Sequence, residues 1–232
     1  MGCEQAMTSY YSQWWENPRD IRNAVFEKLN RYVSSRIPPG DGKRALDLGS
    51  GRGRIVSYLL DKGYQVTAVE LNEDFCAEMR ERFPSVNVIS GDVRHIRFDG
   101  EYDVVTCIEL VQNLQPEELA DLLSRLAPVA RVLLVNISNR DSMHHRWVEL
   151  RGWRNSFVFS YAPGELDRAL RQAGFHTLHQ RGVGLVTPIS LFSGFRGRLL
   201  PAQVANAVNR LDPIAARICH LYYVEAAGNS YQ

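Results

Sequence analysis

The segment from Arg44 to Gly53, which reads RALDLGSGRG, decides the fold. It is a short apolar run that ends in three glycines, each separated by one residue, and this pattern is typical of a buried strand that turns sharply into a helix. Glycine has no Cβ, so its backbone can turn tightly and bring N–H groups close to a bound ligand. The segment therefore predicts a ligand-binding turn after the first strand of an α/β sheet.

Strands and helices alternate along the chain on both sides of this turn. Apolar runs predict strands at residues 44–48, 65–71, 86–89, 102–108, 132–137, 175–183 and 218–226. Apolar residues at helical spacing predict helices at residues 17–35, 55–62, 72–83, 116–126 and 163–173. Because parallel strands need crossover helices, the alternation predicts a Rossmann-like, doubly wound and mostly parallel α/β sheet.

Composition narrows the class of protein. The chain has 232 residues, 45% hydrophobic and 23% charged, with a formal net charge of +1, as expected for one soluble globular domain without the positive field of a general nucleic-acid binder. The four cysteines lie far apart, which indicates neither a disulfide framework nor a zinc site. No apolar run reaches ~18 residues and no signal-peptide pattern opens the chain, so we expect a cytoplasmic protein without a membrane partner.

Acidic residues follow two further strands at the edge where open α/β sheets bind ligands. Glu70 ends the second predicted strand, 23 residues after Asp47, where a carboxylate can accept both hydroxyls of a ribose. Asp92 and Val93 follow the third strand, where a carboxylate can accept from an adenine amino group and an apolar side chain can pack on the ring. Together these positions predict a purine nucleoside site.

A nicotinamide dinucleotide would also suit this arrangement. Its fingerprint is G-x-G-x-x-G, in which the third glycine permits close packing of the helix on the strand. Counting from Gly49, Arg54 stands at that third place. The departure weakens the interpretation as an NAD(P)-dependent oxidoreductase, which stays open as an alternative.

Residues 44–138 resemble the core of the class I S-adenosylmethionine-dependent methyltransferases, whose first motif is an acid followed by glycine-x-glycine-x-glycine. The resemblance implies a seven-stranded sheet with an antiparallel last strand and S-adenosylmethionine as cofactor. It also implies that the glycine turn cradles the methionine part, that Glu70 holds the ribose and that the residues after the third strand bind adenine. The implied cofactor-binding residues are Asp47, Gly49, Ser50, Gly51, Gly53, Glu70, Leu71, Asp92, Val93, Ile108 and Glu109.

The stretch 108–114, IELVQNL, resembles the Glu-x-x-Glu-His segment of small-molecule methyltransferases of the quinone-biosynthesis type. Here Gln112 and Asn113 replace the second acid and the histidine. The replacement removes two ionisable groups, so neither a metal role nor general-base catalysis is expected of these two positions. Glu109 keeps its match, and it either shapes the site or caps the following turn.

Two further candidates lie outside the core. Tyr11 belongs to an aromatic cluster at 10–15 that either contacts the cofactor or the substrate, or packs in the core. His144 and His145 follow the fifth strand on an irregular segment, and one of them is a candidate base for an unactivated hydroxyl; exposed or structural histidines are the alternative.

The chain is expected to form one methyltransferase domain with a helical cap at 1–43, a cofactor-binding core at 44–138 and candidate substrate-cap insertions at 139–161 and 184–217. The second insertion contains a predicted helix at 201–211. Residues 139–217 hold eleven arginines, no lysine and five acids, so the positive charge is local. It indicates either a solvated face with paired charges or a pocket for an anionic substrate.

These observations predict methyl transfer from S-adenosylmethionine to oxygen, or nitrogen, of a small metabolite, with an anionic metabolite favoured by the arginines. A non-catalytic S-adenosylmethionine-binding protein is a second alternative, because Gln112 and Asn113 lack the acid–histidine pair. We expect no metal, no nucleic-acid substrate and a monomer or homodimer.

Overall fold

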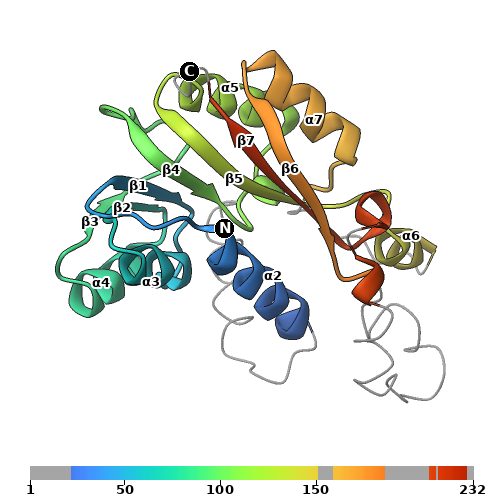
Figure 1. Cartoon of the computed structure of the whole chain (residues 1–232), viewed down its shortest axis with the longest axis horizontal. Coiled ribbons are helices and arrows are strands. Elements are labelled where there is room, and N and C mark those ends of the chain that lie inside the picture. The colour runs from blue at the N-terminus through green and yellow to red at the C-terminus, as the bar shows by residue number, and fades with distance from the viewer. Residues whose placement is uncertain (1–21, 151–158, 186–208, 213, 229–232) are drawn as a thin grey trace, which may run out of the picture.

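Seven strands form one sheet in the order β3-β2-β1-β4-β5-β7-β6 (Figure 1). This computed structural model describes residues 22–150, 159–185, 209–212 and 214–228. The strands are β1 Arg44–Leu48, β2 Gln65–Glu70, β3 Asn87–Ser90, β4 Tyr102–Cys107, β5 Ala130–Ser138, β6 His176–Val183 and β7 Leu221–Ala227. β7 runs antiparallel to both of its neighbours, β5 and β6, and the other strand pairs are parallel. The predicted fold, a mostly parallel seven-stranded sheet with an antiparallel last strand, is confirmed.

Helices cover both faces of the sheet (Figure 1). They are α2 Arg22–Arg36, α3 Arg54–Asp61, α4 Glu73–Arg82, α5 Pro116–Leu126, α6 Met143–Leu150 and α7 Pro163–Gln172, with short 3-10 turns η1 Val111–Asn113, η2 Asn209–Leu211 and η3 Ala216–Ile218. Buried side chains of α2, α3 and α4 form one apolar cluster with one face of the sheet, and those of α5 and α7 form a second cluster with the other face. The sheet is thus buried on both sides, as parallel strands require.

Local sequence signals set where the helices begin. Asn72 caps α4, because its Oδ1 accepts the backbone N–H of Asp74 at 2.9 Å and of Phe75 at 3.2 Å. Pro116 occupies the first turn of α5, and the Glu118 carboxylate accepts the N–H of Gln115 at 2.7 Å. Helix α4 therefore begins directly after the end of β2, whereas α5 begins after the turn η1 that follows β4.

The structure differs from the predictions in the segment that follows β5. Residues 143–150 form helix α6 rather than irregular structure, and Ser142 caps it by accepting the N–H of His145 on its Oγ at 3.0 Å. A serine before an apolar-periodic stretch is a helix-start signal that could have identified this helix. Of the helix predicted at 201–211, only the 3-10 turn η2 falls within the described residues.

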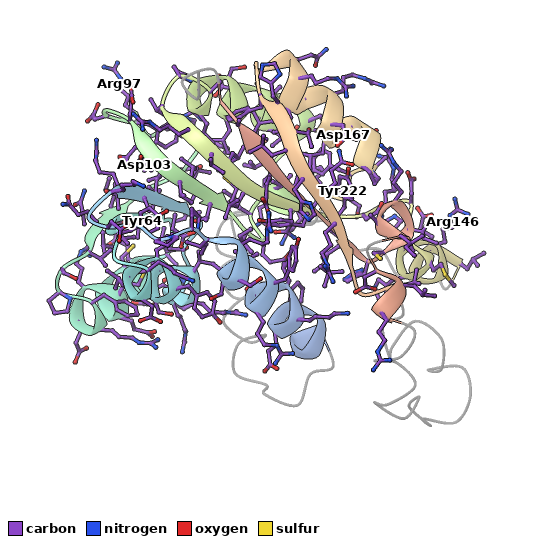
Figure 2. The ribbon with its side chains drawn as sticks, viewed as in Figure 1. Tyr64, Arg97, Asp103, Arg146, Asp167 and Tyr222 are labelled. Atoms are coloured by element: carbon purple, nitrogen blue, oxygen red, sulfur yellow. The ribbon has the colours of Figure 1, made fainter. Side chains whose placement is uncertain are left out.

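Buried carboxylates attach the helices to β7. Asp167 of α7 accepts the Tyr222 hydroxyl at 3.1 Å (Figure 2). On the other face, Glu225 is 6% exposed and pairs with Arg36 at the end of α2, through Nε to Oε1 at 2.5 Å and Nη2 to Oε2 at 2.8 Å. A carboxylate this buried requires its partner, so the Arg36–Glu225 pair fixes α2 against the sheet.

We predict that Arg36→Ala lowers the free energy of unfolding by about 2 kcal/mol, because the buried Glu225 carboxylate loses its bidentate partner while Arg36 itself is partly solvated. Urea denaturation measures the change. The control is Arg31→Ala, which removes an exposed ion pair with Glu27 on the same helix and should cost no more than about 0.5 kcal/mol. Equal losses in the two variants would contradict the anchoring role.

Candidate functional site

A cavity of about 460 Å³ opens at the carboxyl ends of β1, β2 and β4, where the strand order reverses between β1 and β4. Such a switch point is where open α/β sheets bind ligands. Ten of the predicted cofactor-binding residues line this cavity. They are Asp47, Gly49, Ser50, Gly51, Glu70, Leu71, Asp92, Val93, Ile108 and Glu109. The structure therefore brings together residues that are up to 62 positions apart in the chain.

The glycine turn combines a ligand-facing part with a packing part. Gly49 and Gly51 line the cavity with φ of +70° and +54°, a left-handed conformation that favours glycine. Gly53, with φ of +79°, does not line the cavity, and a Cβ at this position would lie 2.7 Å from Cε2 of Phe83. The third glycine thus allows the start of α3 to approach the end of α4.

Asp47 is a buried acid at the end of β1, only 2% exposed. Its Oδ1 accepts the Thr106 hydroxyl at 2.6 Å, whereas its Oδ2 has no hydrogen-bond partner among the described residues. Burial raises the pKa of this carboxyl to about 7, against the opposing hydrogen bonds from Thr106 and Ser50. The unsatisfied oxygen is therefore available to a donor or a cation in the cavity.

Glu70 joins the end of β2 to the glycine turn. Its Oε2 accepts the Gly51 N–H at 2.8 Å and its Oε1 accepts the Asn72 N–H at 2.9 Å. A carboxylate has about four acceptor positions, so each oxygen retains capacity for a ligand hydroxyl after these bonds. Glu70 can thus fix the turn and still accept from a ribose.

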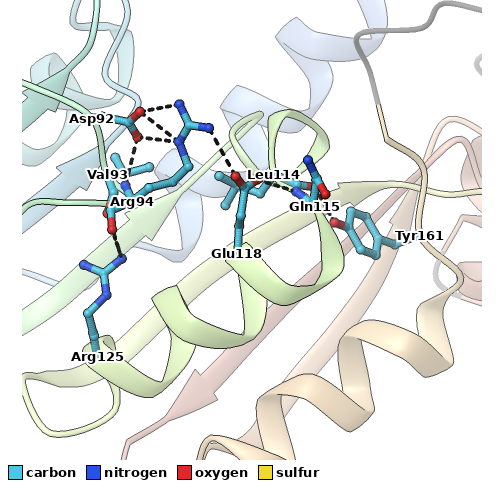
Figure 3. A network of polar contacts seen from close by, with 8 residues as sticks. All are labelled: Asp92, Val93, Arg94, Leu114, Gln115, Glu118, Arg125 and Tyr161. Carbon is cyan, nitrogen blue, oxygen red and sulfur yellow. Dashed lines mark hydrogen bonds and ion pairs between the residues drawn. The ribbon is translucent and has the colours of Figure 1, made fainter.

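Asp92 forms an ion pair that the sequence analysis did not predict (Figure 3). Arg94 donates its backbone N–H and its Nε to Oδ1, each at 2.9 Å, and its Nη1 contacts Glu118 of α5 at 3.1 Å. Burial favours the neutral acid, but the hydrogen bonds from Arg94 hold the pKa of Asp92 below its ordinary value. The Asp-x-Arg spacing, which allows a local pair across two residues, was the available signal.

A second arginine fixes the loop next to this pair. Arg125 of α5 donates its Nη2 to the carbonyl oxygen of Val93 at 2.9 Å and its Nη1 to that of Ile96 at 2.8 Å (Figure 3 shows the Val93 contact). Tyr161 donates its hydroxyl to the carbonyl of Leu114 at the start of the same helix. The backbone that presents Asp92 and Val93 is therefore held from α5.

Glu109 directly follows β4 with φ of +61°, a left-handed conformation that is unusual outside glycine. Asn136 of β5 donates to its Oε1, and Gln112 donates Nε2 to its Oε2 at 3.2 Å. Burial raises the pKa of Glu109 to about 7, while these two hydrogen bonds and the Arg54 charge act in the opposite direction. The cavity thus contains two acids, Asp47 and Glu109, whose pKa is raised to about 7 by loss of solvent.

Helices α2 and α3 contribute cavity residues that sequence reasoning missed. Phe26 and Asn30 come from α2, and Arg54 is the first residue of α3. Asn30 is 5% exposed, and its Nδ2 has no hydrogen-bond partner among the described residues. Its position on the apolar face of α2 was the available signal, since a buried amide needs a partner.

His144 and His145 do not line the cavity described above. The His144 ring packs edge-on against His220 with centroids 4.3 Å apart, and burial lowers the pKa of His144 to about 4. His145 Nε2 lies 3.5 Å from Glu149 on the next turn of α6. Tyr11, the remaining candidate, lies outside the described residues.

Two features are absent from the residues that the structure describes. No group of three or more histidine, cysteine, aspartate or glutamate side chains in them is arranged to hold a metal ion. Within the same ranges, no helix combines the length and the apolar character needed to cross a lipid bilayer.

Comparison with known proteins finds a family match for the cofactor-binding core and similar proteins that span most of the chain. Residues 45–132 match the family described as "Methyltransferase domain". A ubiquinone biosynthesis O-methyltransferase of Thiobacillus denitrificans is 26% identical over 195 residues, 74% of this chain and 81% of that protein. A demethylmenaquinone methyltransferase of Beutenbergia cavernae is 30% identical over 123 residues, about half of each chain.

A solved structure shares the whole fold. The magnesium protoporphyrin IX methyltransferase of Synechocystis PCC 6803, crystallised with bound S-adenosylhomocysteine, superposes with a TM-score of 0.68 over 95% of each chain at 14% identity. The matched residues 45–132 contain the glycine turn and the acids after β1, β2 and β3 that line the cavity. The chain thus shares its fold and the matched segment 45–132 with S-adenosylmethionine-dependent methyltransferases, and it is similar to relatives that carry that activity in their names.

Proposed function

We propose that this enzyme transfers the methyl group of S-adenosylmethionine to an oxygen atom of a small metabolite. The observation that carries the proposal is the convergence of Asp47, Glu70 and Asp92 with the glycine turn in one cavity. Relatives named for ubiquinone and menaquinone biosynthesis support a small acceptor, and those named O-methyltransferases favour oxygen over nitrogen.

The residues of the cavity fit the cofactor. The unsatisfied Asp47 Oδ2 suits its ammonium group, and the remaining acceptor capacity of Glu70 suits the ribose hydroxyls. Leu71 and Val93 offer apolar contacts for the adenine, while Asp92 accepts from its amino group with the oxygen positions that Arg94 leaves open. Ile108 and Glu109, after β4, then lie beside the reacting methyl group.

When bound, the cofactor would supply a methyl group on a positively charged sulfur, and an acceptor atom would attack the methyl carbon in line with the bond to sulfur. The protein has to hold the acceptor and the methyl carbon at reacting distance and to keep water out. Ile108 and Leu110, 7% and 8% exposed, form an apolar wall on either side of Glu109 in the cavity. This apolar wall helps to keep water out of the site. With little water present, the attraction between a carboxylate and a nearby positive charge is stronger.

An anionic acceptor is the finer part of the proposal. The local excess of arginine at 139–217 supports it, and Arg146 is exposed on α6 beyond the end of β5 (Figure 2). Arg151, Arg154 and much of the insertion at 184–217 lie outside the described residues, so the cap function of both insertions stays a prediction. Guanidinium groups suit carboxylate and phosphate acceptors because they bind two oxygens at once.

The proposal has several further parts, which were predicted from the sequence. These are the proton-accepting role of His144 or His145, the cofactor contact of Tyr11, the domain division, the cytoplasmic location, the monomer or homodimer, and the absence of nucleic-acid and membrane partners. The match of residues 45–132 and the similar methyltransferases favour S-adenosylmethionine over a nicotinamide dinucleotide, and a catalytic over a purely binding protein.

We predict that Glu70→Ala raises the Kd for both S-adenosylmethionine and S-adenosylhomocysteine at least tenfold, because the ribose acceptor and the support of the Gly51 N–H are lost together. Calorimetric titration of the purified protein measures both constants, with NAD as the competing cofactor. The matched control is Glu81→Ala, which removes an exposed carboxylate from α4. NAD binding to the wild type without binding of the other two ligands would contradict the proposal.

We predict that Arg146→Glu raises the KM for a carboxylate- or phosphate-bearing acceptor several-fold and leaves the Kd for S-adenosylmethionine unchanged, because Arg146 lies outside the cofactor cavity. The measurement is S-adenosylhomocysteine release with a panel of anionic and neutral quinol and phenol acceptors. The control is Arg80→Glu, which reverses an exposed charge on α4 that lies outside both the cavity lining and the insertions. An unchanged KM would remove Arg146 from the acceptor site.

A further inference from the structure

Glu109 is held by a clamp of two amide side chains. Asn136 accepts the Glu109 backbone N–H on Oδ1 at 2.8 Å and donates Nδ2 to its Oε1. Gln112 donates Nε2 to the Glu109 carbonyl oxygen at 2.7 Å and to its Oε2 at 3.2 Å. Each amide thus binds both the backbone and the carboxylate of the same residue, which fixes the left-handed backbone and the direction of the side chain.

The clamp surrounds the Glu109 carboxylate with neutral donors. An acid at the place of Gln112 would repel the Glu109 charge. Gln112 instead donates to it, and both amides are buried, with Asn136 fully so and Gln112 5% exposed. Asn136 and Gln112 are therefore positioning residues for a single ionisable group on the cavity wall.

The charges around Glu109 leave it responsive to a ligand. Arg54 of α3 also lines the cavity and lowers the Glu109 pKa, whereas burial raises that pKa to about 7. Asp47, which also lines the cavity, is a buried acid at the end of the neighbouring strand β1. A cation that enters the cavity favours the ionised form of Glu109, and a neutral ligand does not.

We propose that Glu109 is the charge partner of the cofactor's sulfonium and takes up a proton when that charge is lost. The inference rests on the proposed function. During transfer the bond between sulfur and the methyl carbon breaks with its electron pair left on sulfur, and the bond between the acceptor oxygen and the methyl carbon forms. The acceptor's hydroxyl proton passes to Glu109 in place of His144 or His145, neither of which lines the cavity. The sulfonium and the carboxylate thereby become a thioether and a carboxylic acid, so this pair has no net charge before or after transfer.

The test compares binding of S-adenosylmethionine with that of S-adenosylhomocysteine, which differ by the methyl group and the sulfonium charge. Titration calorimetry at pH 7 in two buffers of different ionisation enthalpy counts the protons released. We expect S-adenosylmethionine to release up to about half a proton more, because a carboxyl with a pKa near 7 is half protonated before binding. The ratio of the two affinities should rise about tenfold from pH 6 to pH 8, as Glu109 ionises.

Glu109→Gln should make this ratio independent of pH and hold it at its low-pH value. Gln112→Glu is a second variant in case the first fails to fold, and it should move the rise in the ratio to higher pH because the added acid opposes ionisation of Glu109. Glu101→Gln is the matched control, since it removes an exposed carboxylate at the other end of β4 and should leave the ratio as in the wild type.

Some results would overturn the inference. The first is an affinity ratio that does not change with pH in the wild type. The second is a rise of the ratio with pH that persists in Glu109→Gln. The third is a rise that disappears only in Asp47→Asn, which would make Asp47 the charge partner. In these cases both ligands still bind, so the proposed function survives. If neither ligand binds the wild type, the proposed function fails and the inference fails with it.

Discussion

The hydrogen bond from the Gly51 N–H to Glu70 connects the ends of two neighbouring parallel strands, and the cavity depends on it. It ties the turn after β1 to the acid after β2, so the backbone N–H groups and the carboxylate face the same space. Gly53 completes the arrangement by letting α3 start against Phe83 of α4. A side chain at Gly53 would clash with Phe83, and one at Gly51 would strain the left-handed backbone that presents its N–H to Glu70.

Burial of acids in this cavity costs stability, and the fold compensates for it differently at each one. Asp92 is paired with Arg94 and remains charged, whereas Asp47 and Glu109 receive neutral donors that do not offset their burial. Charged and titratable carboxylates therefore line the same cavity. The fixed charge suits recognition of a nucleoside, and the titratable groups suit a ligand whose charge changes during the reaction.

The sequence predicted the sheet and ten cavity residues because both follow from local signals: apolar runs, the glycine turn and acids at strand ends. It missed Asn30, whose signal was a polar residue on the apolar face of α2. It could not predict the contacts of Arg125, because they reach carbonyl groups 29 and 32 residues earlier in the chain. It selected His144 and His145 by their position after β5, but neither lines the cavity: His144 packs against His220, and His145 lies near Glu149. Position after a strand predicts proximity to the site, whereas side-chain direction depends on packing.

Gln112 and Asn113 acquire a different meaning once the fold is known. As sequence, they are losses, since an acid and a histidine are replaced by amides. In the structure, Gln112 binds Glu109 at two points and Asn113 lines the cavity, so the replacement yields one isolated carboxylate with defined donors. Two acids at this turn would share one proton and attract a metal ion, whereas a single clamped acid can respond to the charge of the bound cofactor. The two contacts of Gln112 therefore hold the Glu109 carboxylate in a defined position without placing a second charge beside it.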